Sequence, residues 1–170
     1  MNIGPSLYRI EVKDFTDILA ALRDGRDAII VDWIERVREN AVVETGQRLS
    51  DPVLLDHVPQ LFDAIVDRLL LNRDRADAEY FAALHGFGRR VDGYGLEENV
   101  AELAMFRRAI WAHLSANGAR SDGTCAAMEM IDGMIDRAVL ASVRAFNDPD
   151  ARMLERRAVA RDAVVQDAVG

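Results

Sequence analysis

Apolar residues recur at intervals of three and four positions along most of the chain, with polar residues between them. Two clear stretches carry Ile29, Ile30, Trp33, Ile34 and Val37, followed by Leu61, Ile65 and Leu69. This spacing is that of an α-helix with one buried face. Proline, which interrupts helices, occurs only at positions 5, 52, 59 and 149. The pattern therefore predicts an all-α fold.

Glycine, proline and capping residues indicate the helix boundaries in the first half of the chain. We expect a first helix over residues 14–40, with a break near Gly25 because glycine weakens helix interiors. The sequence Ser50-Asp51-Pro52 predicts the start of a second helix, since Ser or Asp caps free amides and proline fits the first turn. Pro59 has no backbone donor, which predicts a kink or a restart near His57.

Three further helices are separated by glycine-containing turns. We expect the third over 74–91, the fourth from Gly95 to Asn117-Gly118, and the fifth from Ser121-Asp122 to Phe146. The expected inward positions are Phe81, Leu84, Gly88 and Val91, then Leu96, Val100, Leu103, Arg107, Ile110 and Leu114, then Met128, Ile131, Ile135, Val139, Ser142 and Phe146. Trp33, Trp111 and the six methionines are also expected in the core. Short connections between such helices predict an antiparallel helical bundle of about five helices.

The last segment, residues 148–170, has a different composition. It is rich in Ala, Arg and Asp and has no aromatic residue. A weak seam at spacings of three and four runs through Ala151, Leu154, Ala158, Arg161, Val165 and Ala168. We therefore expect residues 1–147 to form the bundle and 148–170 an amphipathic connector or coiled-coil helix, cut from a longer protein. A frayed terminal helix is the alternative.

Composition narrows the class of protein. A chain of 170 residues is long enough for one domain with a sizeable core. The net charge of -8 argues against a general nucleic-acid binder, which needs a basic face. The single cysteine excludes an internal disulfide, and no apolar run approaches the roughly 20 residues that span a bilayer. The start lacks a signal-peptide pattern, so we expect a cytoplasmic protein with no nucleic-acid or membrane partner.

Charged side chains interrupt the apolar pattern on the third and fourth helices. Arg107 falls within the expected inward stripe, and a buried guanidinium must be paired because an unpaired charge costs several kcal/mol. Its candidate partners are Glu102, Asp132 and Asp136. Glu102 lies about 140° round the same helix, which places it better to meet Arg89 or Arg90. The alternatives are a structural ion-pair network, an Arg107 that extends to solvent, and an anionic-ligand pocket or switchable polar network.

The histidines offer several kinds of site. His85 borders the inward face of the third helix beside Gly86 and Gly88, which suggests a close helix approach or room for a ligand. Four roles are open for this histidine: a hydrogen-bonded structural residue, a pH-sensitive switch, a ligand contact or a phosphorylatable site. His57 and His113 fall on other helices, and no metal-binding or catalytic spacing is present. We therefore expect no metal, no cofactor and no enzyme.

Several short motifs together resemble one family. They are His85-Gly86-x-x-Arg89, the Gly93-Tyr94 turn, Glu102 with Arg107 five residues later, Asp136 near Ser142-Val143, and Leu55-Asp56-His57-Val58-Pro59-x-Leu61. Over roughly residues 30–146 the chain resembles the RsbRD amino-terminal domain family. Such domains stand ahead of output modules, in stressosome-type regulators and in histidine kinases of proteobacteria. Leu103 departs from the pattern, in which an aromatic residue is expected after Glu102.

The resemblance implies a cytoplasmic sensory or regulatory domain with no catalysis of its own. It also implies a homodimer whose last helix leads into an output domain such as a histidine kinase core. The family supplies no ligand, so a small ligand stays open. The candidate ligand or switch residues are His85, Arg89, Arg90, Glu102, Arg107, Asp136 and His57.

Three hypotheses follow. The first is a sensory input domain, in which a ligand, a pH change or a partner alters the packing around His85, Arg89, Glu102 and Arg107. That change would reach the output through a shift or rotation of the last helix in a dimer. The second is histidine phosphotransfer on His85. The third is a purely structural dimerisation module.

Overall fold

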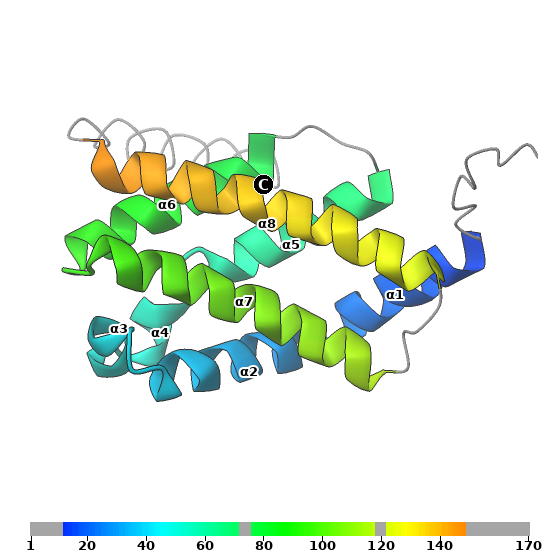
Figure 1. Ribbon diagram of the computed structural model, residues 1–170, viewed down its shortest axis with the longest axis horizontal. Helices are drawn as coiled ribbons and strands as arrows, with labels where there is room; N and C mark the ends of the chain where they lie inside the picture. The colour runs from blue at the N-terminus through cyan, green and yellow to red at the C-terminus, as the bar shows by residue number, and fades with distance from the viewer. Residues whose placement is uncertain (1–11, 72–75, 118–121, 149–170) are drawn as a thin grey trace, which may run out of the picture.

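The computed structural model describes residues 12–71, 76–117 and 122–148, and every regular element in this part of the chain is an α-helix. The helices are α1 (Val12–Asp24), α2 (Arg26–Glu39), α3 (Glu44–Arg48), α4 (Asp51–Leu55), α5 (Val58–Leu71), α6 (Ala76–Val91), α7 (Leu96–Ala116) and α8 (Asp122–Asn147). They pack as an elongated bundle, with α3 and α4 at the end where α6 meets α7 (Figure 1). The all-α prediction is confirmed.

The predicted helix breaks are confirmed. Gly25 separates α1 from α2, and the chain restarts as α5 at Val58, one residue before Pro59. A β-carbon on Gly25 would lie 1.9 Å from Nε2 of His113, so the break also allows α7 to approach closely. The short helix α3 was not predicted. Arg38 of α2 fixes it by donating hydrogen bonds to the carbonyl oxygens of Gly46 and Leu49 at 2.8 and 2.5 Å.

The three longest helices of the second half do not all run antiparallel. Arg107 of α7 pairs with Asp136 of α8, whereas Asn99, eight residues earlier, bonds to Ser142, so α7 and α8 are antiparallel. In contrast, α6 and α8 are parallel: Glu79 faces Arg137, and Gly86 faces Ser142 further along both helices. A β-carbon on Gly86 would lie 2.2 Å from the carbonyl oxygen of Ser142. The glycine therefore permits close packing, one of its two predicted roles.

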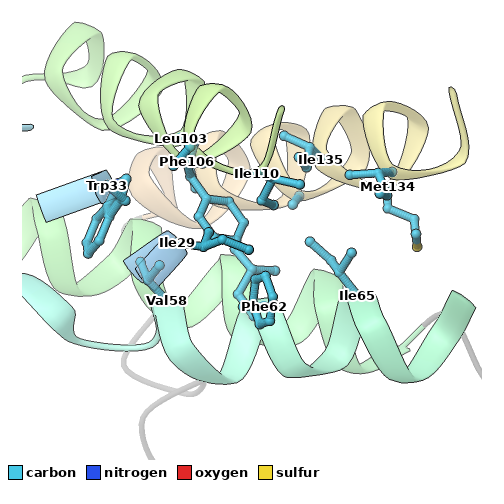
Figure 2. Packing of buried hydrophobic residues seen from close by; sticks show 14 of the residues in the cluster. Ile29, Trp33, Val58, Phe62, Ile65, Leu103, Phe106, Ile110, Met134 and Ile135 are labelled. Carbon is cyan, nitrogen blue, oxygen red and sulfur yellow. The ribbon is translucent and has the colours of Figure 1, made fainter. Parts of the chain in front are cut away.

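The hydrophobic core lies between α2, α5, α7 and α8, and Figure 2 shows part of it. Phe62 of α5 and Phe106 of α7 meet edge to face, with ring centroids 6.3 Å apart. Trp33 is completely buried, as predicted. Burying an aromatic side chain of this size contributes about 2–3 kcal/mol, so these rings help to hold α2, α5 and α7 together.

Some predicted core positions are wrong. Val91 is 70% exposed at the end of α6, and Leu96, Val100, Trp111 and Met130 also lie at the surface. The buried face of α7 contains the predicted Leu103, Ile110 and Leu114, together with Asn99, Glu102 and Phe106, which were not predicted there. The hydrophobic pattern misplaced this face because two of its members are polar and are buried only with partners on other helices.

The predicted connector over 148–170 lies outside the described residues, except for Asp148. None of the helices in the described ranges is long and apolar enough to cross a membrane.

Candidate functional site

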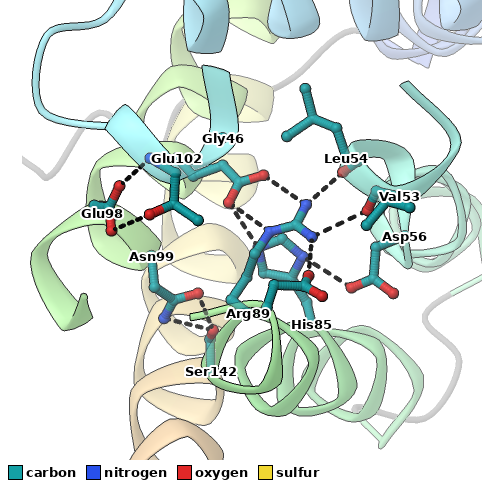
Figure 3. A network of polar contacts seen from close by, with 12 residues as sticks. Gly46, Val53, Leu54, Asp56, His85, Arg89, Glu98, Asn99, Glu102 and Ser142 are labelled. Carbon is teal, nitrogen blue, oxygen red and sulfur yellow. Dashed lines mark hydrogen bonds and ion pairs between the residues drawn. The ribbon is translucent and has the colours of Figure 1, made fainter. Parts of the chain in front are cut away.

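A buried ion pair between Arg89 and Glu102 joins α6 to α7 (Figure 3). Nε of Arg89 donates to Oε2 of Glu102 at 2.7 Å, and Nη2 donates to Oε1 at 2.7 Å. Both side chains have no exposed surface. The tight turn at Asp92–Gly95, in which Gly93 has a φ of 85°, reverses the chain and brings the two helices together. The helix geometry predicted Arg89 or Arg90 as the partner of Glu102, and the partner is Arg89.

The other donors of Arg89 are also occupied. Nη1 donates to the carbonyl oxygen of Val53 and to Oδ2 of Asp92, both at 3.2 Å, and Nη2 donates to the carbonyl oxygen of Leu54. The Tyr94 ring centroid lies 5.0 Å from Cζ, within the range of a cation–π contact. Burial lowers the pKa of Arg89, but the hydrogen bonds and charge of Glu102 raise it further, so the net shift is upward. This guanidinium is therefore a permanent buried cation.

His85 lies between two carboxylates without a hydrogen bond to either. Its Nδ1 is 3.5 Å from Oδ2 of Asp56, and its Nε2 is 3.6 Å from Oε2 of Glu102. Both ring nitrogens are buried and unsatisfied. A neutral imidazole has one donor and one acceptor, so one nitrogen would face a carboxylate with a lone pair. Both ring nitrogens therefore lie close to a carboxylate without a hydrogen bond that fixes the ring.

Asp56 connects α4 to α5 in an unusual backbone conformation. Among the described residues, Asp56 is the only non-glycine residue with a positive φ, which is 39°. Such backbone strain persists only where surrounding contacts enforce it. Oδ1 is 2.6 Å from Nδ1 of His57, and Oδ2 faces His85. Burial raises the pKa of the Asp56 carboxyl, but the neighbouring imidazoles of His57 and His85 lower it by more, so the net shift is downward. Asp56 is therefore an anion held by two histidines.

Three contacts support Glu102 and the packing beside it. The indole Nε1 of Trp33 donates to the backbone carbonyl of Glu102 at 3.2 Å. Asn99, one turn earlier on α7, donates from Nδ2 to Oγ of Ser142 at 3.0 Å, and both side chains are fully buried. Ser142 in turn packs against Gly86, the neighbour of His85. The Asn99–Ser142 pair thus joins α7 to α8 directly beside the polar contacts between α6 and α7 (Figure 3).

Tyr94 and Glu98 close the network toward α3. Burial and the nearby Glu102 carboxylate raise the pKa of Tyr94, so its phenol is neutral. Burial raises the pKa of Glu98, but backbone hydrogen bonds from Gly95 and Thr45 lower it by more. The Glu98 carboxylate, at the first turn of α7, accepts from these amides at 2.7 and 2.6 Å. It therefore fixes both the start of α7 and the position of α3.

Arg90 of α6 lies outside the buried network and contacts the end of α8. Its Nη1 donates to the carbonyl oxygens of Phe146 and Asp148, at 3.0 and 3.1 Å. These carbonyls belong to the end of α8, where helices have no intrahelical donors of their own. Arg89 and Arg90 are adjacent, so one residue of α6 joins the network and the next holds the end of α8.

The structure separates the sequence candidates into two places. His57, His85, Arg89 and Glu102 come together, with Arg90 beside them, whereas Arg107 and Asp136 lie on the outer side of α7 and α8. The prediction that Arg107 faces the core is wrong, because its side chain is 34% exposed. It pairs with Asp136, and its Nε is 3.6 Å from Oδ1 of Asp132, so two of its three predicted partners are correct. A pocket formed jointly by His85 and Arg107 is therefore excluded.

The geometry also bears on metal binding and phosphotransfer. Among the described residues, no group of three or more His, Cys, Asp or Glu side chains has the arrangement of a metal site. A phosphotransfer histidine must be reached by the phosphorylated aspartate of a partner protein. His85 is fully buried between Asp56 and Glu102, so the structure contradicts this alternative.

Sequence reasoning missed several members of the network. Asp56 was part of a family motif, but its role depends on a strained turn that no local pattern predicts. The carbonyls of Val53 and Leu54 are backbone groups and give no residue-level signal. Ser142 did carry a signal, because a polar residue within an apolar stripe predicts a buried polar partner. That partner is Asn99.

A family model described as RsbT co-antagonist protein rsbRD N-terminal domain matches residues 27–161, which is most of the chain. The match includes each helix that contributes to the network, from α2 to α8. Comparison with curated proteins gave no significant match, and neither did comparison with solved structures.

Proposed function

Because the chain belongs to the family of RsbT co-antagonist protein rsbRD N-terminal domains, a family of regulatory domains, we propose that it is a sensory input domain whose buried polar network sets the position of α8. The observation that carries the proposal is that two groups of fully buried polar side chains lie side by side across α6, α7 and α8. His85 and Arg89 contact Glu102, and Asn99 is hydrogen-bonded to Ser142, which packs against Gly86 next to His85.

Buried charge favours a switch over a simple structural role. Buried ion pairs are often no more stabilising than apolar residues of the same shape, so a module that only needs stability gains little from them. Here the two ring nitrogens of His85 also lack hydrogen bonds. We propose that the network has a second arrangement close in free energy in which these atoms find partners, and that a stimulus favouring it shifts the population.

The proposed route to an output begins at two positions on α8, Ser142 and the end of the helix. Ser142 is bonded to Asn99 and packed against Gly86, and the end of the helix is held by Arg90. A rotation or shift of α6 by the network would therefore move the last turn of α8. We propose that this movement continues through residues 149–170 into an output domain, such as a histidine kinase core or a stressosome regulator, in a cytoplasmic homodimer.

Hydrogen exchange tests this route. We expect His85→Gln, which changes the network, and Arg90→Gln, which releases the end of α8, each to increase amide exchange at residues 143–147 by about tenfold or more. Arg144→Gln removes an exposed arginine from the same helix turn and is the matched control. If both variants are folded and exchange at 143–147 equals that of the control, the proposed transmission is wrong.

The same variants separate a sensor from a structural dimerisation module. Sedimentation velocity is expected to give a dimer for the unmodified chain and for Arg90→Gln. A dimer whose α8 exchange is insensitive to both substitutions would favour the structural module. A monomer at high concentration would contradict transmission through a dimer.

A further inference from the structure

A groove on the outer face of the bundle lies away from the buried network. It has a volume of about 480 Å³ and is lined by Arg36 of α2, Arg107, Arg108 and Trp111 of α7, and Asp132 of α8. The groove is open to solvent, so a ligand there would lie against the protein surface rather than be enclosed. Three guanidinium groups and one indole around a single groove are a combination suited to a flat, negatively charged molecule.

Of the three arginines at the groove, Arg36 and Arg107 are paired with carboxylates, and within the described residues Arg108 is not. Nε of Arg36 donates a hydrogen bond to Oδ2 of Asp32 at 2.7 Å, and the two terminal nitrogens of Arg36 stay available. Arg107 pairs with Asp136 and approaches Asp132. Within the described residues, no carboxylate lies within ion-pair distance of Arg108, whose Nη1 is 3.9 Å from Sδ of Met105. Arg108 and the terminal nitrogens of Arg36 are therefore free to bind a carboxylate or a phosphate.

The indole of Trp111 is held in place at the groove. Its Nε1 donates to Oδ1 of Asp132 at 3.0 Å, and the same carboxylate lies 3.6 Å from Nε of Arg107. The side chain is nevertheless 38% exposed, which is unusual for the largest apolar residue. An anchored ring with a free face is arranged for stacking rather than for packing in the core.

We propose that this groove binds a planar organic anion, with its flat part against Trp111 and its carboxylate or phosphate on Arg108 and Arg36. A nucleoside monophosphate and an aromatic carboxylic acid share this chemistry. The site does not depend on the proposed role of the buried network. Binding there would change the surroundings of Arg107, which connects α7 to α8.

Nuclear magnetic resonance gives a direct test, since the chain has two tryptophans and therefore two indole N–H signals. Trp33 is fully buried and serves as an internal reference, and Trp111→Phe assigns the second signal. We would titrate the protein with adenosine 5′-monophosphate and, separately, with indole-3-carboxylate. We expect at least one probe to shift the Trp111 signal saturably with a Kd below about 1 mM, while the Trp33 signal stays in place.

Variants and simpler probes make the test specific. Arg108→Gln is expected to weaken binding about tenfold, because it removes a charged hydrogen-bond donor. Arg144→Gln, an exposed arginine that does not line the groove, is expected to bind as the unmodified protein does. The proposal is overturned if neither probe gives a saturable shift, if inorganic phosphate alone gives the same response, or if Arg144→Gln weakens binding as much as Arg108→Gln.

Discussion

Two of the arginine–carboxylate pairs that connect helices of this domain differ mainly in their surroundings. Arg89 and Glu102 are both completely buried, and Arg89 is further held by backbone carbonyls and Tyr94. Arg107 and Asp136 are 34% and 66% exposed. Water screens the second pair and competes for its hydrogen bonds, whereas each partner of the first depends on the other. Similar residues therefore form a network essential to the fold in one place and a replaceable contact in the other.

Removing the buried anion is expected to have the largest effect. Glu102→Gln leaves the permanent cation of Arg89 without its main counter-charge, which costs about 3–5 kcal/mol. Asp136→Asn is the matched change in the exposed pair. Urea unfolding monitored by circular dichroism measures both. Equal losses in the two variants would mean that burial does not distinguish the two pairs.

Separating α6 from α8 is expected to be the next largest effect. Gly86→Ala introduces a methyl group that would lie 2.2 Å from the carbonyl oxygen of Ser142, so the helices must move apart. Such overpacking costs about 1–3 kcal/mol. Gly133→Ala is the control, because its new methyl group meets only a side-chain nitrogen of Arg137 at 3.8 Å. Alanine there is expected to stabilise α8 by up to about 1 kcal/mol, and a destabilised control would contradict this reading.

Acid is expected to weaken the network through Asp56. Its pKa is lower in the folded protein than in the unfolded chain, where it is about 3.9. The stabilisation is therefore complete above the unfolded pKa and is lost as pH falls through the folded pKa, by an amount of about 2 kcal/mol. The free energy of unfolding, measured between pH 6 and about pH 2.5, is expected to fall less steeply with acid in Asp56→Asn than in the unmodified protein. A profile unchanged by this substitution would remove Asp56 from the account.

The exposed pair is expected to contribute least. Arg107→Gln should change the free energy of unfolding by less than about 1 kcal/mol, and the difference should shrink further at 1 M salt, where the Debye length is about 3 Å. Parallel melts at low and high salt measure this. A loss above about 2 kcal/mol that persists in salt would mean that Arg107 is buried in solution.

The helix boundaries could be predicted because local chemistry determines them. Gly25 and Pro59 act on the backbone of their own segment, and the breaks occur where these residues stand. The buried face of α7 was harder to predict, since Asn99 and Glu102 are polar and depend on residues more than ten positions away. A hydrophobic pattern assigns such residues to the surface. Arg107 was placed inside for the complementary reason, because it stands at an apolar spacing.

The candidate site was predictable only in part. The angular offset along α7 was enough to direct Glu102 toward Arg89, because both residues stand near a tight turn. The parallel packing of α6 and α8 was not predictable from short connections, since it follows from two successive reversals and from the close approach at Gly86. The strained turn at Asp56, which delivers two backbone carbonyls and a carboxylate, is a property of the folded state alone.

Relaxation-dispersion NMR of the unmodified chain tests most directly whether the buried network is a two-state element that reaches the end of α8. The account predicts one shared exchange process, on the microsecond-to-millisecond scale, for amides at 85–92, 99–102 and 142–147. It also predicts that Arg90→Gln changes this process at 142–147. Flat profiles at the end of α8, or exchange rates there that differ from those of the network, would contradict it.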